Sequence, residues 1–233
     1  MTGQKNQFDF NPVAGLYDGW YESREGRRFD LLEKRAVESI LKGISARGRL
    51  LEVGSGTGWW SRFFARRGFT VTGVDVSPQM VRVARNKGIP GAVFQEGDAH
   101  NLACENGEFD VAAAITVLEF TGEPQRVLRE MVRCTRMGGM LVLGVLNAES
   151  PLNRARSRET ASPYAAARFF SAIELRRLLS PLGRVRIIPC AFALSVKLPP
   201  PFGGWLDGLL ARLGQRGGAF LAAEVILCGS KPN

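Results

Sequence analysis

The sequence LLEVGSGTG (residues 50–58) is followed, seventeen residues after Gly58, by Asp75 at the end of VTGVD. This pattern predicts a buried strand, a glycine turn, a helix, and a second strand that ends in an acid. Gly54, Gly56 and Gly58 have no Cβ, so they accept positive φ and let the backbone approach a ligand closely. An acid at the end of the second strand binds ribose hydroxyls in nucleotide folds. The stretch therefore predicts a nucleoside site on an α/β sheet.

The spacing of the glycines distinguishes this site from phosphate-binding loops. A dinucleotide fingerprint has its third glycine one place later, where this chain has Trp59, and the G-K-[ST] of a Walker loop is absent. Glu52 adds a negative charge that would repel a phosphate and attract an ammonium. S-adenosylmethionine (SAM) carries an ammonium, a sulfonium and no phosphate, so the spacing favours this nucleoside. The alternative is a strand-to-helix turn that binds nothing.

With these motifs the chain resembles the class I SAM-dependent methyltransferases, especially the small-molecule group that includes the ubiquinone- and menaquinone-biosynthesis C-methyltransferases. The motifs are specific over residues 50–150 and weaker toward both ends. The resemblance implies SAM as cofactor, the glycine loop under its methionine part, Asp75 on the ribose and Asp98 at the adenine. Many relatives have V-L-E-H where this chain has Phe120 after Glu119, so any role of that histidine is absent here.

The resemblance also implies that residues 109–120 form the fourth strand beside the cofactor and that residues 138–147 form the next turn and strand. The cofactor-binding residues expected in this way are Tyr17, Glu52, Gly54, Ser55, Gly56, Thr57, Gly58, Asp75, Val76, Met80, Gly97, Asp98, Ala99, Thr116 and Val117.

Apolar runs and helical stripes alternate along the chain. The expected strands are residues 50–53, 71–74, 92–95, 109–115 and 140–145, and the expected helices are residues 28–44, 59–67, 78–87, 123–135 and 172–182. Ser77 followed by Pro78, and Ser171, are expected to cap two of these helices.

Residues 185–188 and 219–228 are expected to finish the chain as a hairpin pair of strands. The order predicts one α/β domain over residues 1–233: a Rossmann-like, seven-stranded, mostly parallel sheet with helices on both faces and an antiparallel C-terminal hairpin. Ligands of such sheets bind at the carboxyl ends of the strands, where Gly54, Asp75, Asp98 and Thr116 fall.

Composition narrows the class of protein. The chain has 233 residues, 45% of them hydrophobic, which suffices for one substantial core. No apolar run is long enough to span a bilayer, and the N-terminus lacks a signal-peptide layout, so we expect a cytoplasmic protein without stable membrane insertion. The four widely spaced cysteines, Cys104, Cys134, Cys190 and Cys228, are expected to be reduced core residues. His100 is the only histidine, so we expect no metal site.

The net charge is +9, and such a field attracts nucleic acid or anionic membranes. The arginines are nevertheless spread over several helices and form no dense basic tail, which favours an ordinary solvated surface. We therefore expect a small-molecule acceptor as partner, no nucleic acid, and a monomer or homodimer.

Three segments outside the motifs that carry the resemblance are expected to surround the acceptor. Residues 1–27 are expected to form an N-terminal lid. The resemblance implies that Tyr17 in this lid touches the methionine carboxylate or the sulfonium of SAM. Trp20 and Tyr21 either offer cation-attracting ring faces or hold the N-terminus on the core. Residues 148–170 are expected to be a long loop with little structure, whose arginines meet an anionic acceptor or are solvated. Within residues 198–217 we expect an amphipathic helix. Its apolar face roofs the acceptor pocket, contacts a membrane, forms a dimer or packs on the sheet edge, and it consists of Trp205, Leu206, Leu209, Leu210 and Leu213.

Methyl transfer from SAM needs alignment and exclusion of water more than it needs a catalytic group, because positioning alone can supply about 7–11 kcal/mol. His100, Glu119 and Tyr164 are candidates for a base, and none is assigned as catalytic. The expected function is methyl transfer to a small, partly apolar metabolite such as a phenol, quinone precursor or carboxylate. The alternatives are an RNA or protein methyltransferase, a SAM-binding protein without transfer activity, and a nicotinamide-dependent reductase, which Trp59 disfavours.

Overall fold

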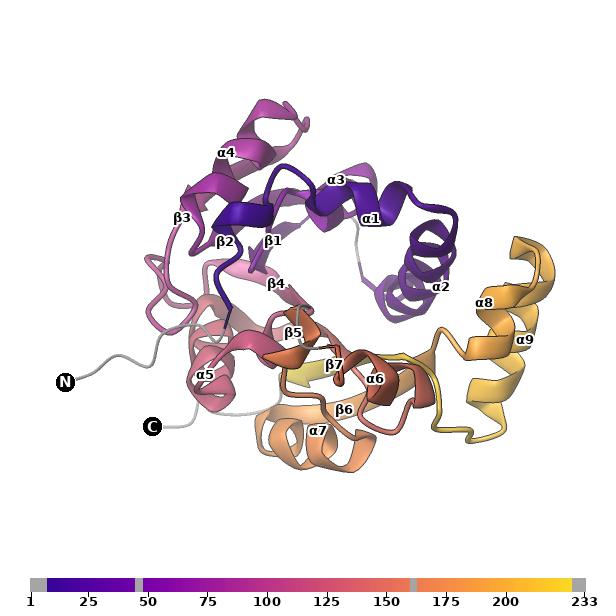
Figure 1. Cartoon of the computed structure of the whole chain (residues 1–233). Helices are drawn as coiled ribbons and strands as arrows, with labels where there is room; N and C mark the ends of the chain where they lie inside the picture. The colour runs from indigo at the N-terminus through magenta and orange to yellow at the C-terminus, as the bar shows by residue number, and fades with distance from the viewer. Residues whose placement is uncertain (1–7, 45–47, 160–162, 228–233) are drawn as a thin grey trace.

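The structure, a computed structural model, describes residues 8–44, 48–159 and 163–227 (Figure 1). Its centre is a seven-stranded sheet in the order β3-β2-β1-β4-β5-β7-β6. Strands β1 (Arg49–Val53), β2 (Thr70–Asp75), β3 (Ala92–Glu96), β4 (Phe109–Ile115) and β5 (Thr135–Leu146) run parallel, whereas β7 (Phe220–Leu227) is antiparallel to both β5 and β6 (Gly183–Cys190). The strand order reverses between β1 and β4, which is where open parallel sheets bind their ligands. The predicted fold class is confirmed.

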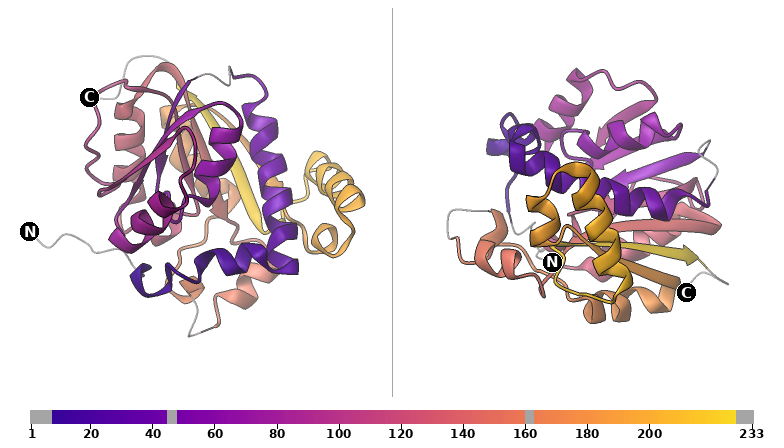
Figure 2. Two further views of the ribbon diagram at one scale, coloured as in Figure 1. Left: turned by 90° about the horizontal axis from the view of Figure 1, so that it is seen from above. Right: turned by 90° about the vertical axis from the view of Figure 1, so that its right-hand side faces the viewer.

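Helices cover both faces of the sheet because alternate residues of the central strands point to opposite sides. Leu51 and Val53 of β1 join the apolar core beneath α5 (Pro124–Cys134) and α7 (Ala172–Leu179), whereas Leu50 joins the core beneath α2 (Arg24–Leu41) and α3 (Trp59–Arg66). Figure 2 shows α2 lying along the sheet on the side opposite α5. Strand β4 is buried on both faces, as its nearly continuous apolar sequence predicted.

Two of the helix caps confirm their sequence signals. The Ser77 hydroxyl accepts a hydrogen bond from the Met80 backbone N–H at the start of α4 (Pro78–Asn86), with Pro78 at the first helical position. At α7 the Ser171 hydroxyl accepts from the Glu174 N–H, and the Glu174 carboxylate accepts from the Ser171 N–H. This capping box satisfies two N–H groups that a helix start otherwise leaves unpaired.

The segment after β5 is more regular than the sequence predicted. Within residues 148–170 the chain forms α6 (Pro151–Arg156) and a 3-10 turn, η3 (Pro163–Ala165). Asn153, which is buried, anchors α6 because its amide donates to the carbonyls of Asn147 (3.0 Å) and Ala219 (2.7 Å). The expectation of a loop with little structure was wrong, because side-chain hydrogen bonds of Asn153 hold α6 in place, and sequence periodicity detects only apolar packing.

The C-terminal strands pair antiparallel as predicted, but no tight hairpin joins them. The connection carries α8 (Ala193–Lys197) and α9 (Pro200–Arg212), which project from the body of the molecule in Figure 2. The inner side of α9 holds Gly203 and Asp207, and the Asp207 carboxylate accepts the N–H groups of Ala191 and Phe192. Of the predicted apolar stripe, Trp205, Leu209 and Leu213 are exposed, Trp205 to 68%, whereas Leu206 and Leu210 are half-buried.

The N-terminal segment lies across the carboxyl ends of β1 and β2 as η1 (Asn11–Val13) and α1 (Tyr17–Glu22) (Figure 1). Asn11 Oδ1 accepts a hydrogen bond from the Ser77 hydroxyl (2.7 Å), which ties η1 to the start of α4. Across the described ranges of the chain, no helix combines the length and apolarity needed to cross a bilayer.

Candidate functional site

The glycine loop joins β1 to α3 with all three glycines in the left-handed region, at φ of +67° for Gly54, +52° for Gly56 and +79° for Gly58. A Cβ on Gly54 would lie 2.4 Å from a methyl of Val117, and one on Gly58 would lie 3.0 Å from Phe94. A Cβ on Gly56 would meet nothing within 4 Å. Packing therefore requires glycine at positions 54 and 58, whereas Gly56 borders open space at the carboxyl end of β1.

Asp75, at the end of β2, holds this loop in place. Its carboxylate accepts the Gly56 N–H (2.8 Å) through one oxygen and the Ser77 N–H (2.9 Å) through the other. Burial raises the pKa of Asp75, and these two backbone hydrogen bonds oppose the rise. Each oxygen keeps a lone pair toward the cavity, so the geometry suits the predicted contact with ribose hydroxyls.

A cavity of about 90 Å³ opens at the ends of β1, β2 and β4 beside this loop. Eleven of the predicted cofactor residues line it: Tyr17, Gly54, Gly56, Asp75, Val76, Met80, Gly97, Asp98, Ala99, Thr116 and Val117. Five further residues line the cavity and were not predicted from the sequence: Phe10, Val74, Ile115, Phe120 and Thr121. Phe10 and Phe120 touch in an edge-to-face contact with ring centroids 5.0 Å apart, so the N-terminal segment closes one wall.

Glu52 does not present its charge to this cavity. Its carboxylate is buried and accepts the hydroxyl of Ser61 on α3, and burial raises its pKa to about 8. The expectation that Glu52 attracts an ammonium was wrong in its geometry, because the side chain of this strand residue points under α3.

Ser55, Thr57 and Gly58, also predicted to bind the cofactor, lie behind the lining residues. The Thr57 hydroxyl donates to Asp18 of α1 (2.5 Å), and Asp18 forms an ion pair with Lys87. Thr57 therefore fixes α1 over the glycine loop. Ser55 is buried against β2, where a Cβ on Gly73 would come within 2.8 Å of the Ser55 Cβ.

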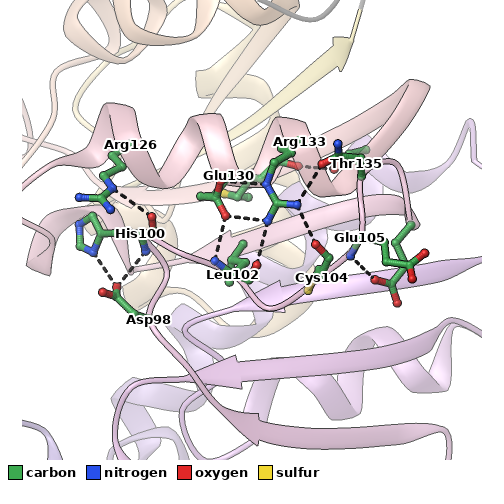
Figure 3. A network of polar contacts seen from close by, with 12 residues as sticks. Asp98, His100, Leu102, Cys104, Glu105, Arg126, Glu130, Arg133 and Thr135 are labelled. Carbon is green, nitrogen blue, oxygen red and sulfur yellow. Dashed lines mark hydrogen bonds and ion pairs between the residues drawn. The ribbon is translucent and has the colours of Figure 1, made fainter. Parts of the chain in front are cut away.

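Beyond Asp98, a polar network fastens the loop after β3 to α5 (Figure 3). Asp98 accepts hydrogen bonds from the backbone N–H of His100 (2.8 Å) and pairs with its ring Nδ1 (2.7 Å). Partial burial opposes these interactions, yet together they lower the pKa of Asp98. Arg133 donates to the carbonyls of Leu102 and Cys104 and pairs with Glu130. His100 is thus a partner of Asp98 at the cofactor end, away from the acceptor side.

No cluster of metal-ligating side chains occurs within the part of the chain that the structure describes. Cys104, Cys134 and Cys190 are free thiols, and Cys228 lies outside the described residues.

A second cavity, of about 260 Å³, adjoins the first. The two share Phe10, Tyr17, Thr116 and Phe120, and the second is further lined by Val13, Leu16, Trp20, Tyr21, Glu33, Leu146, Arg156, Pro163 and Tyr164. Its walls come from α1, α6 and η3, which lie in two of the segments expected around the acceptor, and from α2, which was not expected there. Residues 198–217 contribute nothing to this lining.

Thr116 marks the junction of the two cavities in an unusual backbone conformation. Its φ is +53°, in the left-handed region, which is sterically costly for a β-branched residue. Its N–H donates to the Gly144 carbonyl on β5 (2.7 Å), which fixes the turn at the end of β4. Such strain persists where surrounding structure enforces it, often at functional sites.

The second cavity is aromatic and contains one acid and one cation. The Tyr21 hydroxyl donates to that of Tyr17, and burial raises the pKa of Tyr17 to about 12, so both phenols are neutral. The Arg156 guanidinium lies over the rings of Phe29 (5.0 Å) and Tyr164 (5.2 Å).

Of the three candidate bases, only Tyr164 lines this cavity. Glu119 is buried after β4, in the 3-10 turn η2 (Leu118–Phe120), and accepts the Leu146 N–H (2.5 Å). Glu33 lines the cavity and was missed. Its signal in the sequence was an acid within the apolar stripe of residues 29–41 on α2.

Comparisons with known proteins agree with this geometry. Residues 51–143 match a family described as a methyltransferase domain. An uncharacterized protein of Methanocaldococcus jannaschii is 30% identical over 176 residues, which cover 75% of this chain and 80% of that protein. A ubiquinone biosynthesis O-methyltransferase of Xanthomonas oryzae pv. oryzae is 32% identical over 155 residues, and the match spans 63% of this chain and 64% of that enzyme.

Among solved structures, a SAM-dependent methyltransferase of Thermotoga maritima, described as a possible histamine N-methyltransferase, superposes with a TM-score of 0.72. It is 27% identical in sequence, and the match covers 93% of this chain and 97% of that one.

Proposed function

Since the chain belongs to the class I SAM-dependent methyltransferases and uses SAM as its cofactor, we propose that it methylates a small, partly apolar metabolite. The observation that carries this proposal is the pair of adjoining cavities. One has the glycine loop and Asp75 of a nucleoside site, and the other is a mainly apolar chamber that meets it at Thr116 and Phe120.

The residues of the first cavity fit the cofactor. Gly56 leaves room for a ligand above the loop, Asp75 offers carboxylate oxygens to a ribose, and Val76 and Met80 offer apolar surfaces to a flat base. When bound there, SAM supplies an electrophilic methyl group on a sulfonium. The protein's own part is to hold the acceptor in line with that group and to keep water out, which lowers the barrier chiefly by positioning. Phe10, Tyr17 and Phe120 are placed to do both, since they line the two cavities.

The walls of the second cavity support a small acceptor over a macromolecular one. They are mainly apolar and aromatic, and they come from several elements, among them α1, α2 and η3. The names of the relatives support the same class, since one refers to ubiquinone biosynthesis and another to histamine. An RNA or protein substrate, the rival proposal, would need an open groove at this position.

A test uses SAM labelled in its methyl group with separate panels of phenols, amines, carboxylates, bulk RNA and a protein extract. We expect label to enter one class of small molecule, and Asp75→Ala to lower the transfer at SAM concentrations below saturation. Labelling of RNA or protein alone would overturn the proposal. Binding of SAM without transfer to any class would favour a binding protein.

A further inference from the structure

Glu33 is a buried acid that faces the second cavity without a hydrogen-bond partner. Its residue is only 8% exposed, and it lines the chamber together with Tyr17, Tyr21 and Tyr164. None of the hydrogen bonds among the described residues reaches its carboxyl group. The other two buried glutamates near the site each accept a hydrogen bond within the protein, Glu52 from the Ser61 hydroxyl and Glu119, through one of its two oxygens, from the Leu146 N–H.

Removal of a carboxyl group from bulk water costs free energy unless the group finds a hydrogen-bond donor, and Glu33 is largely removed from bulk water. Here the open side of the group is the cavity itself, so the missing partner is a donor carried by a ligand. A ligand that donates an O–H or N–H to Glu33 would satisfy the group.

The charges around the chamber limit the class of that ligand. Arg156, held over Phe29 and Tyr164, is 3.9 Å from Glu25, and its positive charge disfavours a cationic acceptor beside it. The ionised form of Glu33, which is the form that can accept a proton, disfavours a carboxylate acceptor in the same way. A neutral molecule that gives up a proton during the reaction avoids both penalties, and Arg156 would offset the negative charge that develops.

Several ionisable groups face Glu33 from the elements around it. They are Asp30 and Lys34 on its own helix, Tyr17 and Tyr21 on α1, Glu119 on η2, Arg156 on α6, Tyr164 on η3 and Cys190 on β6. Burial, with a smaller contribution from Asp30, raises the pKa of Glu33 to about 8, while Arg156 and Lys34 oppose the rise. A base with such a pKa is ionised in about a tenth of molecules at pH 7 and is well matched to a phenol.

We propose that Glu33 is the catalytic proton acceptor for the methyl acceptor, and that this acceptor is a neutral aromatic hydroxyl compound, a phenol. The inference rests on the proposed function. In the step, the phenol O–H proton passes to the Glu33 carboxylate while the oxygen forms a bond to the methyl carbon. The methyl–sulfur bond breaks, its electron pair stays on sulfur, and the sulfonium becomes a neutral thioether. Glu33 then releases its proton to solvent, so one proton leaves per methyl group transferred.

The test compares wild type with Glu33→Gln, which keeps the shape and removes the base, and with Glu119→Gln as a matched buried control outside the cavity. Each protein is titrated calorimetrically with S-adenosylhomocysteine. The complex is then titrated with phenol, catechol, 1-naphthol, benzylamine and benzoate. The pH profile of kcat/KM is measured with whichever of these is methylated.

We expect phenols to bind and react in preference to benzylamine and benzoate, and kcat/KM to rise with pH up to about 8. Glu33→Gln should lower kcat/KM by about 100-fold or more, the usual contribution of a general base, and should remove the rise, whereas Glu119→Gln should keep both. An unchanged profile in Glu33→Gln, or a complex that binds the amine or the acid and no phenol, would overturn the inference while leaving the proposed function intact. Absence of nucleoside binding in wild type would instead defeat the proposed function.

Discussion

Replacing Gly56 by alanine separates ligand space from backbone strain, because the chain contains a matched control. Gly56 and Gly88 have φ values of +52° and +53°, and a Cβ on either would meet nothing within 4 Å. The difference is that Gly56 lines the cavity at the end of β1, whereas Gly88 lies in the turn after α4. Both substitutions therefore carry the same backbone penalty, and only one places a methyl group at the site.

The expected magnitudes follow from these two facts. An L-residue in the left-handed region costs about 1–2 kcal/mol, part of which is recovered because alanine restricts the unfolded chain. A loss of about 1 kcal/mol lowers the melting temperature of a protein of this size by about 2–4 °C, and we expect this for both variants. A methyl group forced into a close contact costs a further ~1–3 kcal/mol of binding, which weakens SAM affinity about 5- to 150-fold.

Calorimetric titration with SAM and thermal unfolding monitored by circular dichroism measure these quantities. Gly56→Ala should lose affinity, and Gly88→Ala should bind SAM like wild type at the same reduced melting temperature. Equal SAM affinity in the two variants would refute the assignment of the open space beside Gly56 to the cofactor.

Three further substitutions test other parts of the account. Asp75→Ala should weaken SAM binding at least about tenfold, since hydrogen bonds to a charged group contribute about 1.5–3 kcal/mol. The control in the same titration is Asp110→Ala, which removes a carboxylate that accepts the backbone N–H of Arg49 at the start of β4, the end of the strand away from the cavity. Ser171→Ala should cost about 1 kcal/mol in denaturant unfolding by removing the cap of α7, and a change in SAM affinity would speak against its purely structural role. Burial raises the pKa of Glu119 to about 8, above its value in the unfolded chain. The contribution of Glu119 to the free energy of unfolding is therefore fully present below about pH 4.5 and is lost as the pH rises toward 8. Glu119→Gln should therefore gain stability relative to wild type with rising pH over that window, and a pH-independent difference would contradict the shift.

The sheet and the cofactor loop were predictable because their signals are local. Glycine at a position with positive φ, an acid at a strand end and a serine before a proline each reflect a constraint within a few residues. The segments that misled the sequence analysis depend on long-range contacts. Glu52 belongs to the glycine-loop motif, but its side chain points toward α3, where its carboxylate accepts the Ser61 hydroxyl.

Glu33 and α9 both show what hydrophobic periodicity cannot predict. Glu33 was hidden within the apolar stripe of α2, and only the folded chain places it opposite Tyr164, more than a hundred residues away. In α9 the leucine spacing predicted an amphipathic helix and left open what its apolar face contacts, and in the structure the buried positions are Gly203 and Asp207, whose carboxylate accepts two backbone N–H groups. Periodicity predicts which side of a helix is apolar, and polar anchoring can override it.

We propose that the cavity between the ends of β1, β2 and β4 holds a sulfonium nucleoside. Calorimetric titration of the purified wild-type chain with SAM and, separately, with NADH tests this proposal. We predict saturable binding of SAM at one site and no binding of NADH. Heat from NADH with none from SAM would contradict the account.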